Sequence, residues 1–185
     1  SIFKPIVAAA ALDKELARPQ DVYFCENGKL KIGNATIGEA SNHKFGWMTM
    51  NDIIAKSSNI GVVKIAQQVG KKSFYEYIRK FGFGEKSGLS LPGESAGQLK
   101  AQQNWSNLSL ASLSFGHEIA VTPIQMVSAL SAIANGGNLM EPHITKALIK
   151  NGKVVQQFKP KKIHRVISEK ASLQMVEILK SVVKT

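Results

Sequence analysis

The segment Ser1–Leu12, SIFKPIVAAAAL, places a serine and a lysine directly before an apolar run. Strong helix formers predict a helix over residues 1–17, and Pro5 is tolerated in a first turn. Ser1 and Lys4 then share one helix face. The apolar residues would bury this helix, and a dry environment lowers the pKa of a lysine. The segment therefore presents Ser1 and Lys4 as a candidate nucleophile and base.

The S-x-x-K pattern alone is weak, because a capping serine followed by a surface lysine gives the same letters. A second polar group stands at Ser57–Asn59, SSN, between two predicted helices. A Ser-x-Asn turn can direct a hydroxyl and an amide into one cleft. The hydroxyl could relay a proton, and the amide could bind the backbone of an extended substrate. The alternative is the end of one helix followed by the cap of the next.

Composition narrows the class of protein. The chain has 185 residues, 44% of them hydrophobic, which excludes a disordered chain and fits one domain or part of one. No apolar run approaches the roughly 20 residues of a membrane span. The net charge of +11 suits an anionic partner, but the lysines are scattered, and the densest run, Lys159–Lys162, has no interleaved aromatics. A solvated basic surface is the simpler interpretation, and we expect no nucleic-acid partner.

The metal-binding residue types point to no metal or cofactor site. Cys25 is the only cysteine, so an internal disulfide is excluded, and no neighbouring basic residue predicts a reactive thiolate. The four histidines do not have metal-ligand spacing. We therefore expect neither metal nor cofactor.

Local signals divide the chain into mainly helical segments. The sequence predicts helices over residues 49–56, 60–69, 71–82, 106–113, 122–134 and from Ser168 onward. Thr49 and Asp52 are predicted to form a capping box, Thr122 is a predicted N-cap followed by proline, and Ser168 is a predicted cap of the last helix. Strand-like pieces lie between residues 21 and 37, with Asn27-Gly28 as the hairpin turn, and Asn151-Gly152 predicts a second hairpin. Strands and helices do not alternate, so the fold class is α+β.

Together these motifs resemble a known family. S-x-x-K with an S-x-N triplet belongs to the signature of serine β-lactamases and penicillin-binding proteins. Three further stretches, FGFGEKSGLSLPGE at 81–94, SFGHEIAVTPIQMVSALSAIANGG at 114–137 and EPHI at 141–144, resemble the transpeptidase domain of class B penicillin-binding proteins. The run at 93–116 is more similar to the septal, cell-division branch than to the elongation branch. The resemblance covers almost the whole chain, as a partial transpeptidase domain over residues 1–185.

The resemblance implies a β-lactamase/transpeptidase-like fold and a mechanism. Ser1 would be acylated by a D-alanyl-D-alanine stem peptide, with Lys4 as general base. Ser57 would pass a proton toward the leaving amine, Asn59 would hold Lys4 and the substrate amide, and Ser58 would contribute to substrate binding. Peptidoglycan stem peptides, β-lactam antibiotics and cell-division proteins are the implied partners. The family places this domain outside the cytoplasmic membrane, on the periplasmic side, and anchors it through a segment that we do not find in this chain.

The third family motif, K-T-G, is not recognised. Lys184-Thr185 resembles its start, but these residues close a predicted amphipathic helix whose apolar face includes Leu173, Val176, Leu179 and Val183. The resemblance places K-T-G on a central strand, so we expect it further along, with an incomplete sheet and slow acylation for these 185 residues alone. His117 and Glu118 also depart from the family pattern, and we predict a structural role for both.

Alternatives of the same fold stay open. A class A β-lactamase needs a glutamate that activates water, and none of Glu39, Glu85, Glu94 and Glu118 can be assigned to that task from the sequence. A D,D-carboxypeptidase or a penicillin-sensing receptor domain would share the acylation motifs. A basic nucleic-acid-binding module is the least favoured alternative, because no such motif is present.

Overall fold

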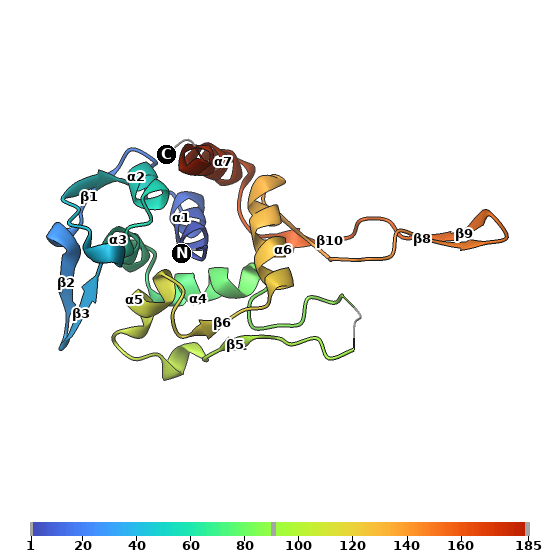
Figure 1. Ribbon diagram of the computed structural model, residues 1–185, viewed down its shortest axis with the longest axis horizontal. Coiled ribbons are helices and arrows are strands. Elements are labelled where there is room, and N and C mark those ends of the chain that lie inside the picture. Colours follow the sequence, from blue (N-terminus) through green and yellow to red (C-terminus); the bar gives the residue numbers. More distant parts are fainter. Residues whose placement is uncertain (1, 90–91, 184–185) are drawn as a thin grey trace.

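The computed structural model describes residues 2–89 and 92–183, and Figure 1 shows a helical body from which one hairpin extends. The described helices are α1 (Lys4–Asp13), α2 (Met50–Ala55), α3 (Asn59–Val69), α4 (Lys71–Lys80), α5 (Ser109–Ser114), α6 (Pro123–Ala134) and α7 (Glu169–Val183), with 3₁₀ turns η1 (Glu26–Gly28), η2 (Ala40–Asn42) and η3 (Gln102–Asn104). None of these helices is both long and apolar enough to cross a membrane.

The strands are short and pair two by two. They are β1 (Val22–Phe24), β2 (Lys29–Ile32), β3 (Ala35–Gly38), β4 (Trp47–Thr49), β5 (Gln98–Leu99), β6 (Ile119–Ala120), β7 (Asn138–Met140), β8 (Ala147–Lys150), β9 (Lys153–Gln157) and β10 (Lys162–Arg165). The antiparallel pairs are β1–β4, β2–β3, β5–β6, β7–β10 and β8–β9. Within the described residues no sheet is wider than two strands, so the helices form most of the hydrophobic core. The hairpin predicted at Asn151-Gly152 is confirmed.

Helix α1 forms the centre of this core. Every residue from Lys4 to Leu12 is buried, and the helix contacts α2, α3, α4 and α7 around it (Figure 1). Four consecutive alanines, Ala8–Ala11, allow these neighbours to approach closely, because a methyl group adds little width to a helix. The helix is shorter than the predicted residues 1–17. It ends at Asp13, since the chain turns into a left-handed conformation at Glu15 (φ 54°).

The predicted helix caps are confirmed. Thr49 Oγ1 accepts from the Asp52 N–H at 3.1 Å, and the Asp52 side chain accepts in return, which makes the predicted capping box. Thr122 and Gln125 form a second box in front of α6, with proline at the first helical position. Ser168 caps α7 through the Ala171 N–H at 3.2 Å. Such caps fix where each helix begins.

The predicted turn at Asn27-Gly28 is wrong. These residues lie in η1, while the hairpin β2–β3 turns after Ile32, and β1 pairs with the distant strand β4. Both residues do have positive φ angles, 49° and 92°, as the sequence suggested. Gly28 is required for a different reason, because a Cβ there would lie 2.3 Å from the carbonyl oxygen of His43.

The predicted apolar face of α7 is also displaced. Leu173 is 62% exposed and Val183 is 89% exposed, whereas Met175 and Ile178 are buried. The buried stripe contains Ala171, Ser172, Met175 and Ile178. It is set by α1, α2 and α6, which all contact this helix. The sequence shows two apolar faces, and only the tertiary contacts choose between them.

Candidate active site

Lys4 and Ser57 form the centre of the candidate site. Lys4 is the first residue of α1, and its side chain is almost completely buried. Its Nζ donates to the carbonyl oxygen of Ser57 and, at 2.9 Å, to the Ser57 Oγ. Ser57 follows α2 in a left-handed conformation (φ 58°), which costs a residue with a side chain about 1–2 kcal/mol. The fold thus maintains an unfavourable backbone geometry that brings the Ser57 oxygens to the Lys4 amine.

The environment of Lys4 prepares it to accept a proton. Burial lowers the pKa of Lys4 from 10.5 to about 8, while the negative charge of Glu39 acts in the opposite direction. A lysine with this pKa is neutral in about one molecule in ten at pH 7. The neutral amine carries a lone pair, so Lys4 can act as a base near physiological pH.

Glu39 organises the turn that contains Ser57. It follows β3 directly and is buried at the N-terminus of α3. Its carboxylate accepts the Ser58 hydroxyl, the Asn59 N–H at 2.6 Å and the Ile60 N–H at 3.3 Å. A carboxylate is favoured at this end of a helix, where N–H groups lack partners. Sequence reasoning did not assign Glu39 a role, because no motif surrounds it; only the fold places it beside the triplet.

The remaining predicted site residues are Ser1, Ser58 and Asn59. Ser1 lies outside the described residues. Ser58 is fully buried, and its hydroxyl caps α3 by accepting from the Gly61 N–H at 2.9 Å, so its part in substrate binding stays a prediction. The Asn59 amide donates to the Gly38 carbonyl oxygen at 3.0 Å. In the described part of the chain no hydrogen bond joins Asn59 to Lys4, because that amide binds the end of β3 instead.

Further expectations concern Glu118, His117, Cys25 and metal binding. Glu118 accepts from the Ser109 Oγ at 2.8 Å and forms an ion pair with Lys100, which agrees with the predicted structural role. The His117 ring packs edge-on against Phe115. Cys25 is buried, and burial raises the pKa of its thiol, as expected for an unreactive cysteine. Among the described residues no group of three histidine, cysteine or acidic side chains converges as a metal site would require.

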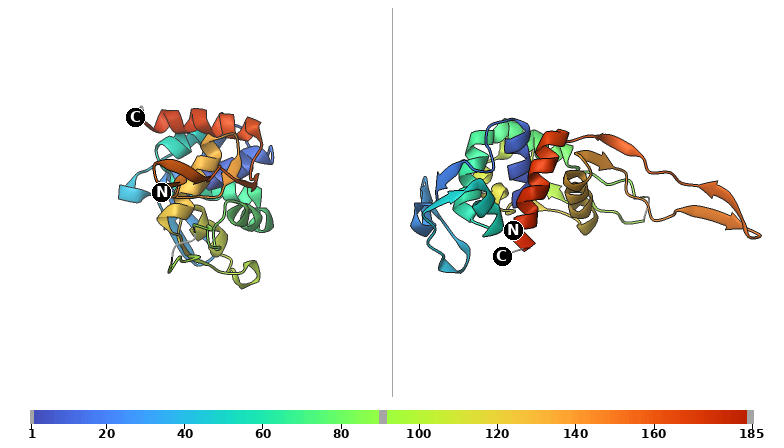
Figure 2. Two further views of the ribbon diagram at one scale, coloured as in Figure 1. Left: turned by 90° about the vertical axis from the view of Figure 1, so that its right-hand side faces the viewer. Right: turned by 90° about the horizontal axis from the view of Figure 1, so that it is seen from above.

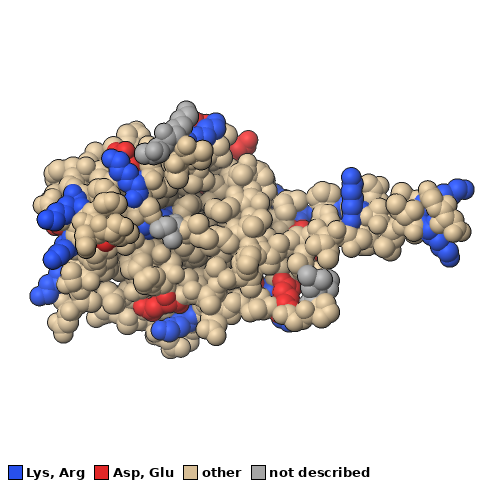
Figure 3. Space-filling view, in the orientation of Figure 1, with Lys and Arg blue, Asp and Glu red and all other residues tan. Residues whose placement is uncertain are grey.

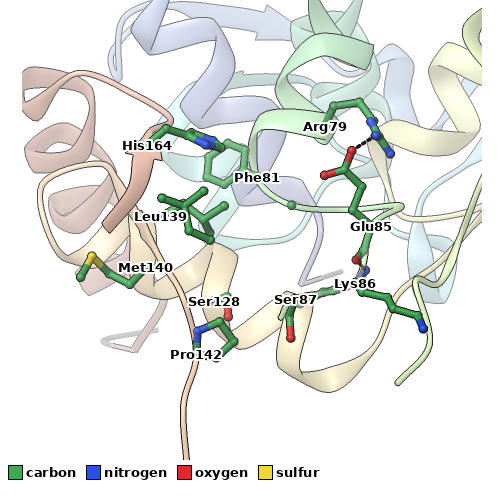
Figure 4. Close-up of a pocket in the computed structure, with 13 residues that line it drawn as sticks. Arg79, Phe81, Glu85, Lys86, Ser87, Ser128, Leu139, Met140, Pro142 and His164 are labelled. Carbon is green, nitrogen blue, oxygen red and sulfur yellow. Dashed lines mark hydrogen bonds and ion pairs between the residues drawn. The ribbon is translucent and has the colours of Figure 1, made fainter. Parts of the chain in front are cut away.

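A separate pocket lies away from this centre. Figure 4 shows it between the end of α4, α6, β7 and β10, with Phe81, Leu139 and His164 on one side and the ion pair of Arg79 and Glu85 on the other. Its volume of about 80 Å³ is far below the several hundred cubic ångströms of a typical ligand pocket. Lys4 and Ser57 do not line it. We therefore assign it no part in the chemistry.

Comparison with known proteins identifies the family. A family model, the penicillin binding protein transpeptidase domain, matches residues 1–185. The chain belongs to this family. Penicillin-binding protein PbpB of Mycolicibacterium smegmatis is 36% identical over 185 residues, which cover 100% of this chain and 28% of that protein. Peptidoglycan D,D-transpeptidase FtsI of Escherichia coli is 30% identical over 146 residues, covering 79% of this chain and 24% of that protein.

A solved structure agrees with the fold. Penicillin binding protein 3 of Mycobacterium tuberculosis, complexed with ampicillin, matches with a TM-score of 0.90 and 34% identity over 100% of this chain and 41% of that chain. The predicted α+β transpeptidase fold is confirmed, as is the class B family. The chain spans about a quarter of the length of the curated relatives named here.

Proposed function

We propose that this chain supplies the acylating centre of a serine peptidoglycan D,D-transpeptidase. The observation that carries the proposal is the buried Lys4 amine, 2.9 Å from the Ser57 hydroxyl. In the sequence Lys4 stands three residues after Ser1, the S-x-x-K spacing of the family signature. A base with a pKa near 8, a hydroxyl in contact with it and a serine that acts as the nucleophile are the parts that acyl transfer needs.

The proposed reaction proceeds in two acyl transfers. The neutral amine of Lys4 accepts the Ser1 hydroxyl proton as the Ser1 Oγ bonds to the carbonyl carbon of the penultimate D-alanine. The C–N bond to the terminal D-alanine breaks, and its nitrogen receives a proton through Ser57. An amine of a neighbouring stem peptide then attacks the ester carbonyl. The new amide forms, and the proton lost by that amine returns to the Ser1 oxygen.

The proposal extends to ligands and cellular context. The Escherichia coli relative is named a peptidoglycan D,D-transpeptidase, and the Mycobacterium tuberculosis structure is complexed with ampicillin. On this basis we propose stem peptides as substrates and β-lactams as inhibitors that acylate Ser1. We further propose that the protein acts in septal wall synthesis with cell-division proteins, membrane-anchored and facing the periplasm. The similarity of the run at 93–116 to the septal branch supports that role.

The β-lactamase alternative receives no support from the glutamates. Each of the four considered has another partner: Glu39 at the N-terminus of α3, Glu85 on Arg79, Glu94 on Ser87 and Glu118 on Ser109. Hydrolysis of an acyl-enzyme at Ser1 would need a carboxylate that orients water beside it. We therefore propose a long-lived β-lactam adduct rather than rapid turnover. A D,D-carboxypeptidase or a receptor domain would form the same adduct but would not join two stem peptides.

The first test is the site of covalent labelling. The natural protein that contains these residues is incubated with a fluorescent penicillin, and the digested adduct is mapped by mass spectrometry. We expect the label on Ser1. A label on Ser57 contradicts the assignment of Ser1 as the nucleophile. Loss of the label through hydrolysis within the assay contradicts the assignment as a transpeptidase. Incorporation of an added acceptor amine into a stem-peptide substrate separates a transpeptidase from a carboxypeptidase or a receptor.

The pH dependence of acylation provides a second test. Because burial lowers the pKa of Lys4 to about 8 and only the neutral amine is a base, the rate should increase about tenfold per pH unit below pH 8 and level off above it. The second-order rate constant for a fluorescent penicillin is measured across this range. A flat profile, or an increase centred near the ordinary lysine value of 10.5, would show that Lys4 is not the titrating base.

A further inference from the structure

The hairpin arm, residues 142–162, differs in charge from the rest of the molecule. Residues 142–168 contain no aspartate or glutamate, although the chain has 13 acidic residues in total. Six lysines lie on the arm itself: Lys146, Lys150, Lys153, Lys159, Lys161 and Lys162. Lys161 pairs with Glu141 at the base of the arm. The other five form no ion pair with the described residues, so the arm presents uncompensated positive charge.

The arm projects away from the body that stabilises the other elements. Strands β8 and β9 extend beyond the helices in Figure 1 and in the right-hand view of Figure 2, and lysines stand out near the far end in Figure 3. Almost every residue of the arm is exposed. Ile149 and Val154 lie directly opposite each other and are 67% and 60% exposed. An isolated two-stranded hairpin is marginally stable in water, so this arm lacks the packing that normally supports one.

The tip of the arm carries a repulsion that an anion would relieve. Lys150 and Lys153 are directly paired across the strands, next to the turn. Like charges in this position destabilise a hairpin. A partner with carboxylates at the tip would remove the repulsion, while its apolar side chains could cover Ile149 and Val154. The pattern of charge and exposed aliphatic groups therefore fits a partner that alternates acidic and apolar residues.

The backbone of the arm favours a peptide over other anions. Within the described residues β8 and β9 pair only with each other, so each has an open edge of N–H and C=O groups. A membrane surface offers no backbone that could extend this ladder of hydrogen bonds. Strands β8 and β9 contain no aromatic residue on which a nucleic-acid base could stack. An extended peptide satisfies the edge by adding a strand, and its side chains meet the lysines.

We infer that the hairpin arm binds an acidic, extended segment of a partner protein, which adds as a third strand beside β8 or β9. This inference is independent of the proposed chemistry at Ser1. Lysines select the segment by charge, the open strand edge holds its backbone, and Ile149 and Val154 contact its apolar side chains. The surface is thus a docking site placed away from Lys4 and Ser57.

The test uses a labelled probe peptide in which glutamate alternates with valine. Its binding to the natural protein is measured by fluorescence anisotropy. We expect saturable binding that the double variant Lys150→Glu/Lys153→Glu weakens by at least about tenfold, because like charges then meet at the tip. The matched control is Lys14→Glu/Lys72→Glu, which reverses two exposed lysines on the body and gives the same net charge. It should bind the probe nearly as well as the unmodified protein.

Two further probes separate strand addition from charge alone. A peptide of the same sequence, N-methylated at alternate residues, keeps its carboxylates but cannot donate along one edge, and we expect it to bind much more weakly. Equal binding of both peptides overturns the inference. It is also overturned if phosphatidylglycerol vesicles or single-stranded DNA bind the arm while the acidic peptide does not, or if both double variants lose the peptide equally.

Discussion

Replacement of Lys4 by arginine should lower the rate of acylation by β-lactams about 10²–10⁴-fold, the usual contribution of a general base. Arginine retains the positive charge, but its pKa is too high for it to release a proton in the accessible range. Its planar group is also larger than the buried ammonium of Lys4, which contacts both Ser57 oxygens. The measurement is the second-order rate constant for a fluorescent penicillin on the natural protein and its variant.

Two controls accompany this substitution. Lys14→Arg changes an exposed lysine just after the same helix and should leave the rate unchanged. Lys4→Met gives an apolar side chain one atom shorter and removes a buried charge, so the protein should stay folded, yet acylation should still be lost. Thermal melts verify folding in each case. A folded Lys4→Met protein that acylates at near the original rate would remove Lys4 from the mechanism.

The features that sequence predicted best are those decided within a few residues. The box at Thr49 and the caps at Thr122 and Ser168 each depend on a side chain and an N–H three residues later. The turn at Asn151-Gly152 depends on two residues that accept left-handed geometry. Such hydrogen bonds depend little on the rest of the chain, and therefore the local sequence is enough to locate them.

The incorrect predictions concern features that depend on contacts between residues far apart in the sequence. Asn27 and Gly28 do have left-handed geometry, but the chain from His43 onward packs against Gly28, and β1 finds its partner in β4 rather than next along the chain. The face of α7 that is buried depends on three other helices. Neither outcome is encoded in a short window of sequence. Length and propensity can locate a helix or strand in the sequence, but which elements it packs against depends on the whole fold.

The candidate site also depends on contacts that a short stretch of sequence does not predict. Lys4 and Ser57 are 53 positions apart, and only the family resemblance, not a local rule, indicated that both belong to one site. Glu39 was weighed only as a possible water-activating residue, because its position just beyond a strand carries no recognisable signal. Its importance depends on three donors that α3 brings to it.

Replacement of Glu39 by glutamine should therefore have the second-largest effect. An amide retains one acceptor oxygen, but its NH₂ group would face the N–H donors of Asn59 or Ile60. A buried donor without an acceptor costs about 1–3 kcal/mol, so the free energy of unfolding should fall by that amount. The turn at Ser57 should also shift, and the maximal acylation rate should fall about 10–10²-fold. The matched control is Glu26→Gln, which breaks a partly exposed ion pair with Lys64 and should alter stability by less than about 1 kcal/mol.

The pH profile of the Glu39→Gln protein distinguishes positioning from mere loss of stability. The negative charge of Glu39 raises the pKa of Lys4, against the larger lowering by burial. Removing that charge takes away the opposing influence, so the Lys4 pKa should fall further below its present value of about 8. The midpoint of the acylation profile should then move to lower pH while the plateau drops. A variant that only unfolds more readily would lower the rate at every pH and leave the midpoint where it was, and that result would show that Glu39 supports the fold without acting on Lys4.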